Sequence, residues 1–273
     1  MDAMKQVGTG FRMVYTGLML KVLGVVIFLV GFIFLVGGAI NAGPGGAGAV
    51  AGGAVVLTLV TRGLVFTGSL VELIGRIKCL AIPQSLVSAK QLIVASVCLQ
   101  AITMILTILI LLNELAGPFL PLGLTASLGL VNMIFWIASE IVFIQFIKAV
   151  ARGIRRRDLE KKAGTVLSLA IVLTVLYVIN TVVTIVAIMN VVGGGVGGLQ
   201  AAAGGGMIAA VLGLAILVLG IITLIFYARL LLAMQAACNK YSYNAAYDDD
   251  EEDDDYDDRP RKKRRDDDDD DDR

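Results

Sequence analysis

Hydrophobic and polar positions alternate along this chain in long blocks rather than residue by residue. Apolar runs of about 20 residues or more, each long enough to cross a bilayer as a helix, are separated by short connectors. Continuous runs are typical of membrane helices, because the strands of a membrane β-barrel alternate apolar and polar residues with period two. The pattern predicts six spans, over residues 21–40, 57–81, 92–112, 122–147, 166–192 and 207–234.

The second of these runs is the weakest, because Arg62 and Glu72 interrupt it. On insertion scales a charge at the centre of a membrane helix costs ~2.5–3.5 kcal/mol. Arg62 can extend its side chain to the outer interface if the helix begins near it. Arg76 and Lys78 then mark the inner end of the span, which we expect to stop before Pro83.

Lysine and arginine collect in every second connector and at both ends of the chain. Connectors 41–53, 113–121 and 193–206 hold neither residue and are rich in glycine or contain proline. Because basic loops stay in the cytoplasm, this predicts an integral membrane protein with both termini cytoplasmic. The basic loop between the fourth and fifth spans should fix this orientation most strongly. Its basic residues are Lys148, Arg152, Arg155, Arg156, Arg157, Lys161 and Lys162.

The predicted fold class is therefore all-α, a polytopic bundle of six transmembrane helices. The same alternation of charge is consistent with three tandem hairpins, each reading basic, apolar, Gly/Pro-rich, apolar, basic. The alternative is that any six-span chain with short loops gives such a pattern. We expect the transmembrane domain to cover residues 1–247, with a charged tail over residues 248–273.

Composition agrees with a membrane protein and argues against several enzyme classes. The chain is 57% hydrophobic with a mean hydropathy of +0.83, whereas soluble domains are usually about 45–50% apolar. It has no histidine, which removes histidine bases and histidine-containing zinc sites. Cys79, Cys98 and Cys238 lie far apart without metal-like spacing, so we also expect no structural disulfide.

Motifs that carry chemistry are missing from the sequence. It contains no HExxH, no GxSxG and no Walker A pattern. The glycine pattern that starts at Gly193 lies between two spans, with no strand before it, and is not a dinucleotide fingerprint. We therefore predict no catalytic residue, no metal and no cofactor, and a protein that is not an enzyme.

Glu72 and Glu140 are the only carboxylates inside the predicted spans. An acid within the membrane is costly and marks a functional hypothesis by default. The structural interpretation pairs Glu72 with Arg76, one helical turn away, and Glu140 with a basic residue of a neighbouring helix. The functional interpretation makes Glu140 a proton-binding site. We favour the structural pairs.

Polar residues recur at helical spacing on the third and fifth spans. The structural interpretation is hydrogen bonding between helices, worth ~0.6 kcal/mol per bond, or bonding to the helix's own backbone. The functional interpretation is a polar lining for a solute path. The stripe residues are Ser96, Gln100, Thr103 and Thr107 on the third span and Thr174, Tyr177, Thr181 and Thr184 on the fifth.

Glycine recurs every seven residues on the first and sixth spans. This period keeps the glycines on one face of a helix and lets two backbones approach closely. We predict that both faces are packing seams, against neighbouring helices or against each other. The residues are Gly17, Gly24, Gly31 and Gly38 on the first span and Gly206, Gly213 and Gly220 on the sixth. Three tyrosines near and beyond the end of the sixth span are candidate interfacial anchors, Tyr227, Tyr241 and Tyr243.

A net charge of zero hides a strong partition between membrane domain and tail. Residues 248–273 hold 17 acidic and 7 basic residues, a net charge of −10, which leaves +10 for residues 1–247. Such charge blocks cannot bury a core, and we expect the tail to be disordered. Acids flank the basic block 259–265 within about one Debye length, ~8 Å, so we expect no nucleic-acid binding. The tail either remains solvated or docks on the basic loop or on a basic cytoplasmic partner.

Together these observations favour a non-catalytic integral membrane protein, a scaffold or assembly subunit whose tail recruits a cytoplasmic partner. The alternative is a small channel or transporter with a polar path along the third and fifth spans near Glu140. Besides the lipid bilayer, the expected partners are further copies of the chain or another membrane protein. The direction in which the polar stripes face discriminates between the two functions.

Overall fold

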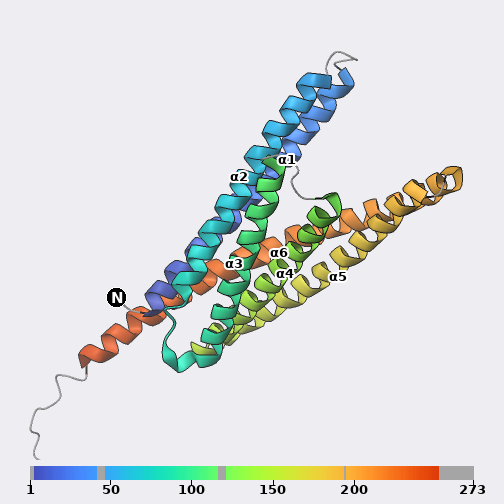
Figure 1. The fold of residues 1–273 in the computed structure, drawn as a ribbon. Helices are drawn as coiled ribbons and strands as arrows, with labels where there is room; N and C mark the ends of the chain where they lie inside the picture. The colour runs from blue at the N-terminus through green and yellow to red at the C-terminus, as the bar shows by residue number, and fades with distance from the viewer. Residues whose placement is uncertain (1–2, 42–46, 116–120, 194, 252–273) are drawn as a thin grey trace, which may run out of the picture.

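The computed structural model describes residues 3–41, 47–115, 121–193 and 195–251, and within these ranges it contains helices and no strand. Each of the six long helices contains a segment apolar and long enough to cross a membrane. The prediction of an all-α fold with six membrane-spanning helices is thus confirmed. The helices are α1 (Ala3–Asn41), α2 (Ala47–Cys79), α3 (Val87–Leu115), α4 (Leu122–Gly153), α5 (Arg157–Gly193) and α6 (Gly195–Glu251), with a short 3₁₀ helix, η2 (Gln84–Leu86), before α3 (Figure 1).

The helices extend beyond the predicted spans. Residues 195–206, predicted as part of a glycine-rich connector, belong to α6, and α2 begins at Ala47 rather than after Gly53. Glycine costs about 1 kcal/mol in a helix relative to alanine, but a bilayer offers the backbone no hydrogen-bond partners and so favours continuous helix. At its other end α6 continues to Glu251, four residues into the predicted tail. The remainder of that tail, residues 252–273, lies outside the described residues.

Consecutive helices pack as three antiparallel hairpins, α1 with α2, α3 with α4, and α5 with α6. Figure 1 shows the α1–α2 and α5–α6 hairpins diverging from each other, with α3 and α4 between them. The hairpins converge at one end of the molecule, where α6 also packs along α1. We call this end, which holds the start of α1, residues 80–86 and the turn at 154–156, the inner end. Whether the hairpins arose by duplication stays a prediction.

The hydrophobic core lies at the inner end. Phe11 of α1 packs against Phe143 and Phe146 of α4, with ring centroids 6.3 and 6.0 Å away, and all three side chains are fully buried. Val7 and Val14 extend the buried face of α1 by one turn on either side, since residues three and four apart share a helix face. Residues that precede the predicted first span therefore contribute to the core.

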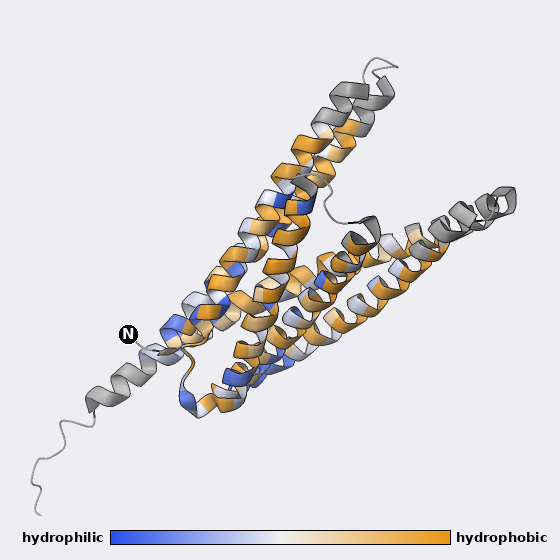
Figure 2. Ribbon diagram, in the orientation of Figure 1, coloured by the Kyte–Doolittle hydropathy of each residue, from blue (hydrophilic) through white to orange (hydrophobic). Residues whose placement is uncertain are grey.

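Away from the inner end the hairpins expose apolar side chains. Phe34 near the far end of α1 is 75% exposed and Val211 of α6 is 70% exposed. Figure 2 shows hydrophilic residues gathered mainly at the inner end, while the hairpin shafts are mostly hydrophobic. Apolar side chains exposed along whole helices are what a lipid environment accommodates.

Candidate functional site

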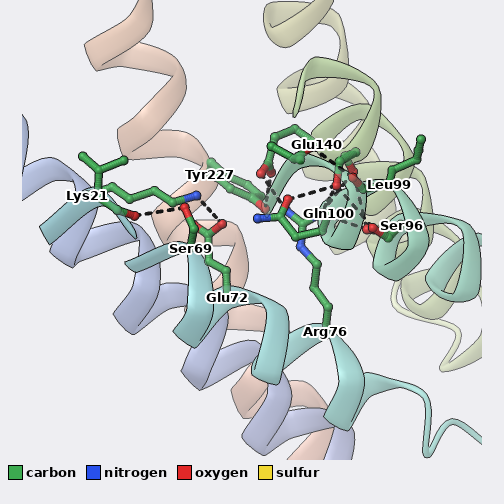
Figure 3. A network of polar contacts seen from close by, with 12 residues as sticks. Lys21, Ser69, Glu72, Arg76, Ser96, Leu99, Gln100, Glu140 and Tyr227 are labelled. Carbon is green, nitrogen blue, oxygen red and sulfur yellow. Dashed lines mark hydrogen bonds and ion pairs between the residues drawn. The ribbon is translucent and has the colours of Figure 1, made fainter. Parts of the chain in front are cut away.

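A network of charged and polar side chains lies next to the core, where the three hairpins meet (Figure 3). Its central residue is Arg76, which has no exposed surface although it belongs to a membrane-spanning helix. We call this group the charge network. Its members are Lys21 on α1, Glu72 and Arg76 on α2, Ser96 and Gln100 on α3, Ser139 and Glu140 on α4, and Tyr227 on α6.

Arg76 joins α2 to α3 and α4. Its Nη2 atom lies 2.6 Å from Glu140 Oε1 in an ion pair, and its Nη1 atom donates hydrogen bonds to the hydroxyls of Ser96 and Ser139. The guanidinium carbon also lies 4.6 Å from the centre of the Phe143 ring, a cation–π contact. A planar guanidinium with five donors can satisfy several acceptors at once, so one side chain connects three helices.

Glu140 connects all three hairpins. It accepts from Arg76 in the first hairpin and lies on α4 of the second, while the Tyr227 hydroxyl of the third donates to its Oε2 atom at 3.3 Å. Its side chain retains 20% exposure, in contrast to the fully buried Arg76. Tyr227 itself is only 8% exposed. Its predicted role as an interfacial anchor is wrong, because its ring is in the core and its hydroxyl binds an acid.

Glu72 pairs within the first hairpin rather than with Arg76. Lys21 Nζ on α1 donates to Glu72 Oε2, and Glu72 is almost fully buried. Glu72 and Arg76 are one turn apart on α2, yet each forms its ion pair with a different helix, α1 or α4. The sequence expectation of a Glu72–Arg76 pair is therefore replaced by two pairs that link helices.

Glycines bring α1 and α2 close enough for the Lys21–Glu72 pair. A Cβ atom on Gly17 would lie 2.5 Å from the carbonyl oxygen of Gly68 and 2.9 Å from the backbone nitrogen of Glu72. Gly10, seven residues earlier, faces Gly75 in the same way. Only glycine permits such an approach of two backbones. This seam therefore fixes the relative position of α1 and α2 at which Lys21 contacts Glu72.

The two glycine stripes behave differently in the structure. Gly17, Gly24 and Gly31 face α2, whereas Cβ atoms added to Gly213 and Gly220 would meet no atom within 4 Å. Within the described part of the chain, the two stripes thus do not pack against each other, and Gly213 and Gly220 form no seam with another helix. A seven-residue period marks one face of a helix but does not specify its neighbour. The surroundings of Gly38 and Gly206 lie outside the described residues.

The polar stripe of the third span faces α4. Ser96 and Gln100 are fully buried, and Ser139 of α4 donates to Gln100 Oε1 at 3.2 Å. Farther along, Asn132 of α4 donates to Thr107 at 3.3 Å. Thr103 and Thr107 also bond the carbonyls one turn before them on α3. A neighbouring helix therefore covers most of this stripe.

The stripe of the fifth span does not join the charge network. Thr174, Thr181 and Thr184 each donate to a carbonyl of α5 one turn earlier, at 2.8–2.9 Å, which satisfies the hydroxyl without a second helix. Tyr177 is 42% exposed. The structure thus separates the two stripes that the sequence grouped together.

The basic loop forms a turn at the inner end. Arg155 adopts a left-handed conformation with φ 57°, and the Arg156 amide donates to the Ala151 carbonyl at 2.9 Å across the end of α4. Two acids in this region are already paired, Glu160 with Arg152 and Asp158 with Arg156. Of the predicted loop residues, Lys148 is half-buried and Arg152, Arg155, Arg156, Arg157, Lys161 and Lys162 are exposed.

Sequence reasoning identified both acids of the network but not their partners. The sequence pattern places Lys21 at the boundary of a span and does not distinguish Ser139 from other serines. The signal for Lys21 was its position one turn beyond Gly17 on the glycine face of α1. For Ser139 the signal was a serine directly before an acid in an otherwise apolar run.

The network is an array of alternating charges that satisfy one another. Over the described residues, no group of three or more His, Cys, Asp or Glu side chains is close enough to hold a metal ion. Two buried donors, Arg76 Nε and Gln100 Nε2, have no hydrogen-bond partner within the described part of the chain. The side chains of the network can form ion pairs, donate and accept hydrogen bonds, and exchange protons.

The fold and this network define the class of the protein, a multi-pass α-helical integral membrane protein. Comparisons of the chain with protein-family models, with curated proteins and with solved structures find no match.

Proposed function

We propose that the chain is a non-catalytic membrane scaffold or assembly subunit whose C-terminal tail recruits a partner in the cytoplasm. The observation that carries the proposal is the position of Glu140, which binds Arg76 of the first hairpin and Tyr227 of the third. Intramembrane charges are thereby used to hold the hairpins in one arrangement. A scaffold needs such a fixed arrangement, whereas a transporter needs polar groups that can release their partners.

The energetics of a bilayer support this interpretation. Lipid tails are as apolar as leucine, so apolar contact alone does not favour one helix neighbour over another. Breaking a buried ion pair leaves an uncompensated charge at a cost of ~3–5 kcal/mol. The charge network therefore discriminates strongly between correct and incorrect packing of the hairpins.

The apolar hairpin shafts supply the second requirement of a scaffold, surface for other molecules. Ile33, Phe34 and Val211 are each at least 69% exposed and are covered in a membrane by lipid or by another protein. The open faces of Gly213 and Gly220 are of the kind that admits a close helix neighbour. A further copy of the chain or another membrane protein is the partner expected there.

The orientation belongs to the same proposal. Exposed lysines and arginines lie at the inner end, and such residues stay on the cytoplasmic side. The start of α1 and the end of α6 reach the same end of the molecule, so both termini would be cytoplasmic. Epitope tags at the two ends should both be protected in sealed, right-side-out cells and both accessible after permeabilisation.

The function is tested by purification in mild detergent and by flux measurements. Subunit number and co-purifying proteins are determined for the full chain and for a variant lacking residues 252–273. The proposal expects stable assembly in both and tail-dependent recovery of a cytoplasmic partner. It also expects liposomes containing the protein to leak no faster than empty ones.

A second candidate, a small channel or transporter, is favoured by one specific observation. Glu140 and Lys21 keep 20% and 16% side-chain exposure, and the nearby donors Arg76 Nε and Gln100 Nε2 lack partners within the described residues. An exchangeable proton or water could be bound there. Flux that is present with the native chain, abolished by Glu140→Gln and retained by Thr181→Val would replace the scaffold proposal with this one.

A further inference from the structure

The inner end carries a cluster of cations that the rest of the fold leaves unpaired. Figure 1 shows the connection between α2 and α3 next to the turn between α4 and α5, and Leu86 contacts Gly153 there. Exposed lysines and arginines lie in the turn and on the ends of the helices that these two segments join. We call this set the cationic face; it consists of Lys78, Lys90, Arg155, Arg157, Lys161 and Lys162.

The acids available nearby are already occupied. Asp158 and Glu160 form ion pairs with Arg156 and Arg152. Within the described residues, none of the six cations of the cationic face has an ion-pair partner. Unpaired like charges on one surface raise the local potential and attract an anionic ligand.

The C-terminal tail has the matching chemistry. Its acidic residues lie in two blocks, 248–258 and 266–272, on either side of the basic block 259–265. The tail carries a net charge of −10 against +10 for the remainder of the chain. Its own basic block cannot neutralise this excess, so acids remain for another cationic surface.

The tail also starts at the inner end of the molecule, the end that carries the cationic face (Figure 1). Ser242 of α6 is still buried, and the helix continues for nine residues beyond it to Glu251, a length of about 14 Å at 1.5 Å per residue. The 22 residues that follow can extend to about 70 Å. They are therefore long enough to return along α6 and reach the cationic face.

We propose that the acidic blocks of the tail dock on the cationic face of the same chain and form an electrostatic cover. Tethering gives the acids an effective local concentration of the order of millimolar, which favours this contact over a free anionic ligand. Anionic lipid headgroups attract the same cations by about 1 kcal/mol per residue near the surface. The tail is therefore released when an anionic lipid leaflet binds the cationic face or when a basic partner binds the tail. This inference rests on the proposed function in one respect: the tail and the inner end must lie on the same side of the membrane.

The test is zero-length carbodiimide cross-linking of the full chain in nanodiscs of neutral lipid, with one copy per disc. The reagent joins carboxylates only to lysines that they touch. Peptide mass spectrometry should find tail acids joined to Lys78, Lys90, Lys161 or Lys162 at about 0.01 M salt. These links should fall several-fold at about 1 M salt, where the Debye length shrinks from about 30 to about 3 Å.

Two variants control the experiment. Changing Arg155, Arg157, Lys161 and Lys162 to glutamine should lower the remaining links to Lys78 and Lys90 without unfolding the chain, because all four side chains are exposed. Changing the tail acids to their amides should abolish the links. Replacing part of the neutral lipid with an anionic lipid should reduce them.

Three results would each overturn the proposal. They are cross-links confined to Lys262 and Lys263 of the tail itself, cross-links whose yield does not change with salt, and no cross-links in neutral lipid. The scaffold function fails by a different result, a partner whose recovery is unchanged when residues 252–273 are removed. The two proposals can thus be rejected independently.

Discussion

The inner end and the far halves of the hairpins are built from the same helices but are held together differently. At the inner end Phe11, Phe143 and Phe146 are fully buried beside Arg76. Farther along the same helices Phe34 is 75% exposed and Ile134 is 61% exposed. Both regions are rich in apolar residues, so hydrophobicity does not explain why the helices bury their side chains only at the inner end.

What distinguishes the inner end is its polar content. Lys21, Glu72, Arg76 and Glu140 form two ion pairs that link helices, and backbone contact at Gly17 and Gly10 brings α1 against α2. In a bilayer apolar surface is satisfied equally by lipid, whereas a charge is satisfied only by a partner or by water. The hairpins therefore converge where they must satisfy charges and separate where they need not.

The largest effect should come from removing the central cation. Arg76→Met leaves Glu140 without its ion-pair partner in the membrane interior, at a cost of ~3–5 kcal/mol. Thermal unfolding in detergent can be followed with a thiol-reactive dye in a Cys98→Ala background, because Cys79 and Cys238 are buried at the inner end. The exposed Arg229 provides the control, Arg229→Met, and equal melting of the two variants would contradict the prediction.

The next largest effect should follow from widening the α1–α2 seam. Gly17→Ala places a Cβ atom 2.5 Å from a backbone oxygen, and such overpacking costs ~1–3 kcal/mol. The matched change Gly220→Ala enters open space and should be neutral or stabilising by up to about 1 kcal/mol through helix propensity. The same dye assay measures both, and a reversed order would show that the seam is not close-packed in the membrane.

A smaller loss is expected from the link to the third hairpin. Tyr227→Phe removes the hydrogen bond to Glu140 and should cost ~0.6 kcal/mol, with an upper range near 1.7 kcal/mol. Labelling of Cys238 on the same helix, resolved from Cys79 by peptide mass spectrometry, should become faster. Tyr177→Phe, on the exposed surface of α5, should leave the rate unchanged. Equal rates for the two variants would remove Tyr227 from the network.

The smallest effect is expected on the fifth span. The Thr181 hydroxyl bonds the Tyr177 carbonyl of its own helix, so Thr181→Val should change stability by less than about 0.5 kcal/mol. Ser96→Ala, which removes an acceptor of buried Arg76, should cost more, ~1–3 kcal/mol. If both variants melt alike, the distinction between the two polar stripes is lost.

Most of the fold could be predicted from the sequence because each helix appears as an uninterrupted apolar run. The helix ends could not be predicted in the same way. Glycine indicates a connector in a soluble protein, whereas a bilayer favours continuous helix even in a glycine-rich segment such as residues 195–206. The start of α1 at Ala3 also lies outside the predicted span. Its buried apolar residues are Met4, Val7, Phe11 and Val14, interspersed with polar and small residues. This pattern is too weak to identify core without knowing the partner helix.

The site was predictable in part for a related reason. Glu72 and Glu140 are conspicuous as acids in apolar runs, but their partners lie 51 and 64 residues away. Which cation reaches which acid depends on the rotation of each helix about its axis. Close contacts such as that of Gly17 with Gly68 set this rotation. The glycine pattern marks the contact face of α1 but does not identify the helix that packs against it.

The central claim, that the Arg76–Glu140 pair ties the hairpins together, is tested most directly by a double-mutant cycle on the free energy of unfolding. Arg76→Met and Glu140→Leu are measured singly and together in detergent. Replacing both partners of a buried pair by apolar residues is often neutral, whereas removing one costs ~3–5 kcal/mol. The account predicts that the double variant loses far less unfolding free energy than the two single variants lose together. Strictly additive losses would contradict it, because they would mean that the two residues stabilise the fold independently.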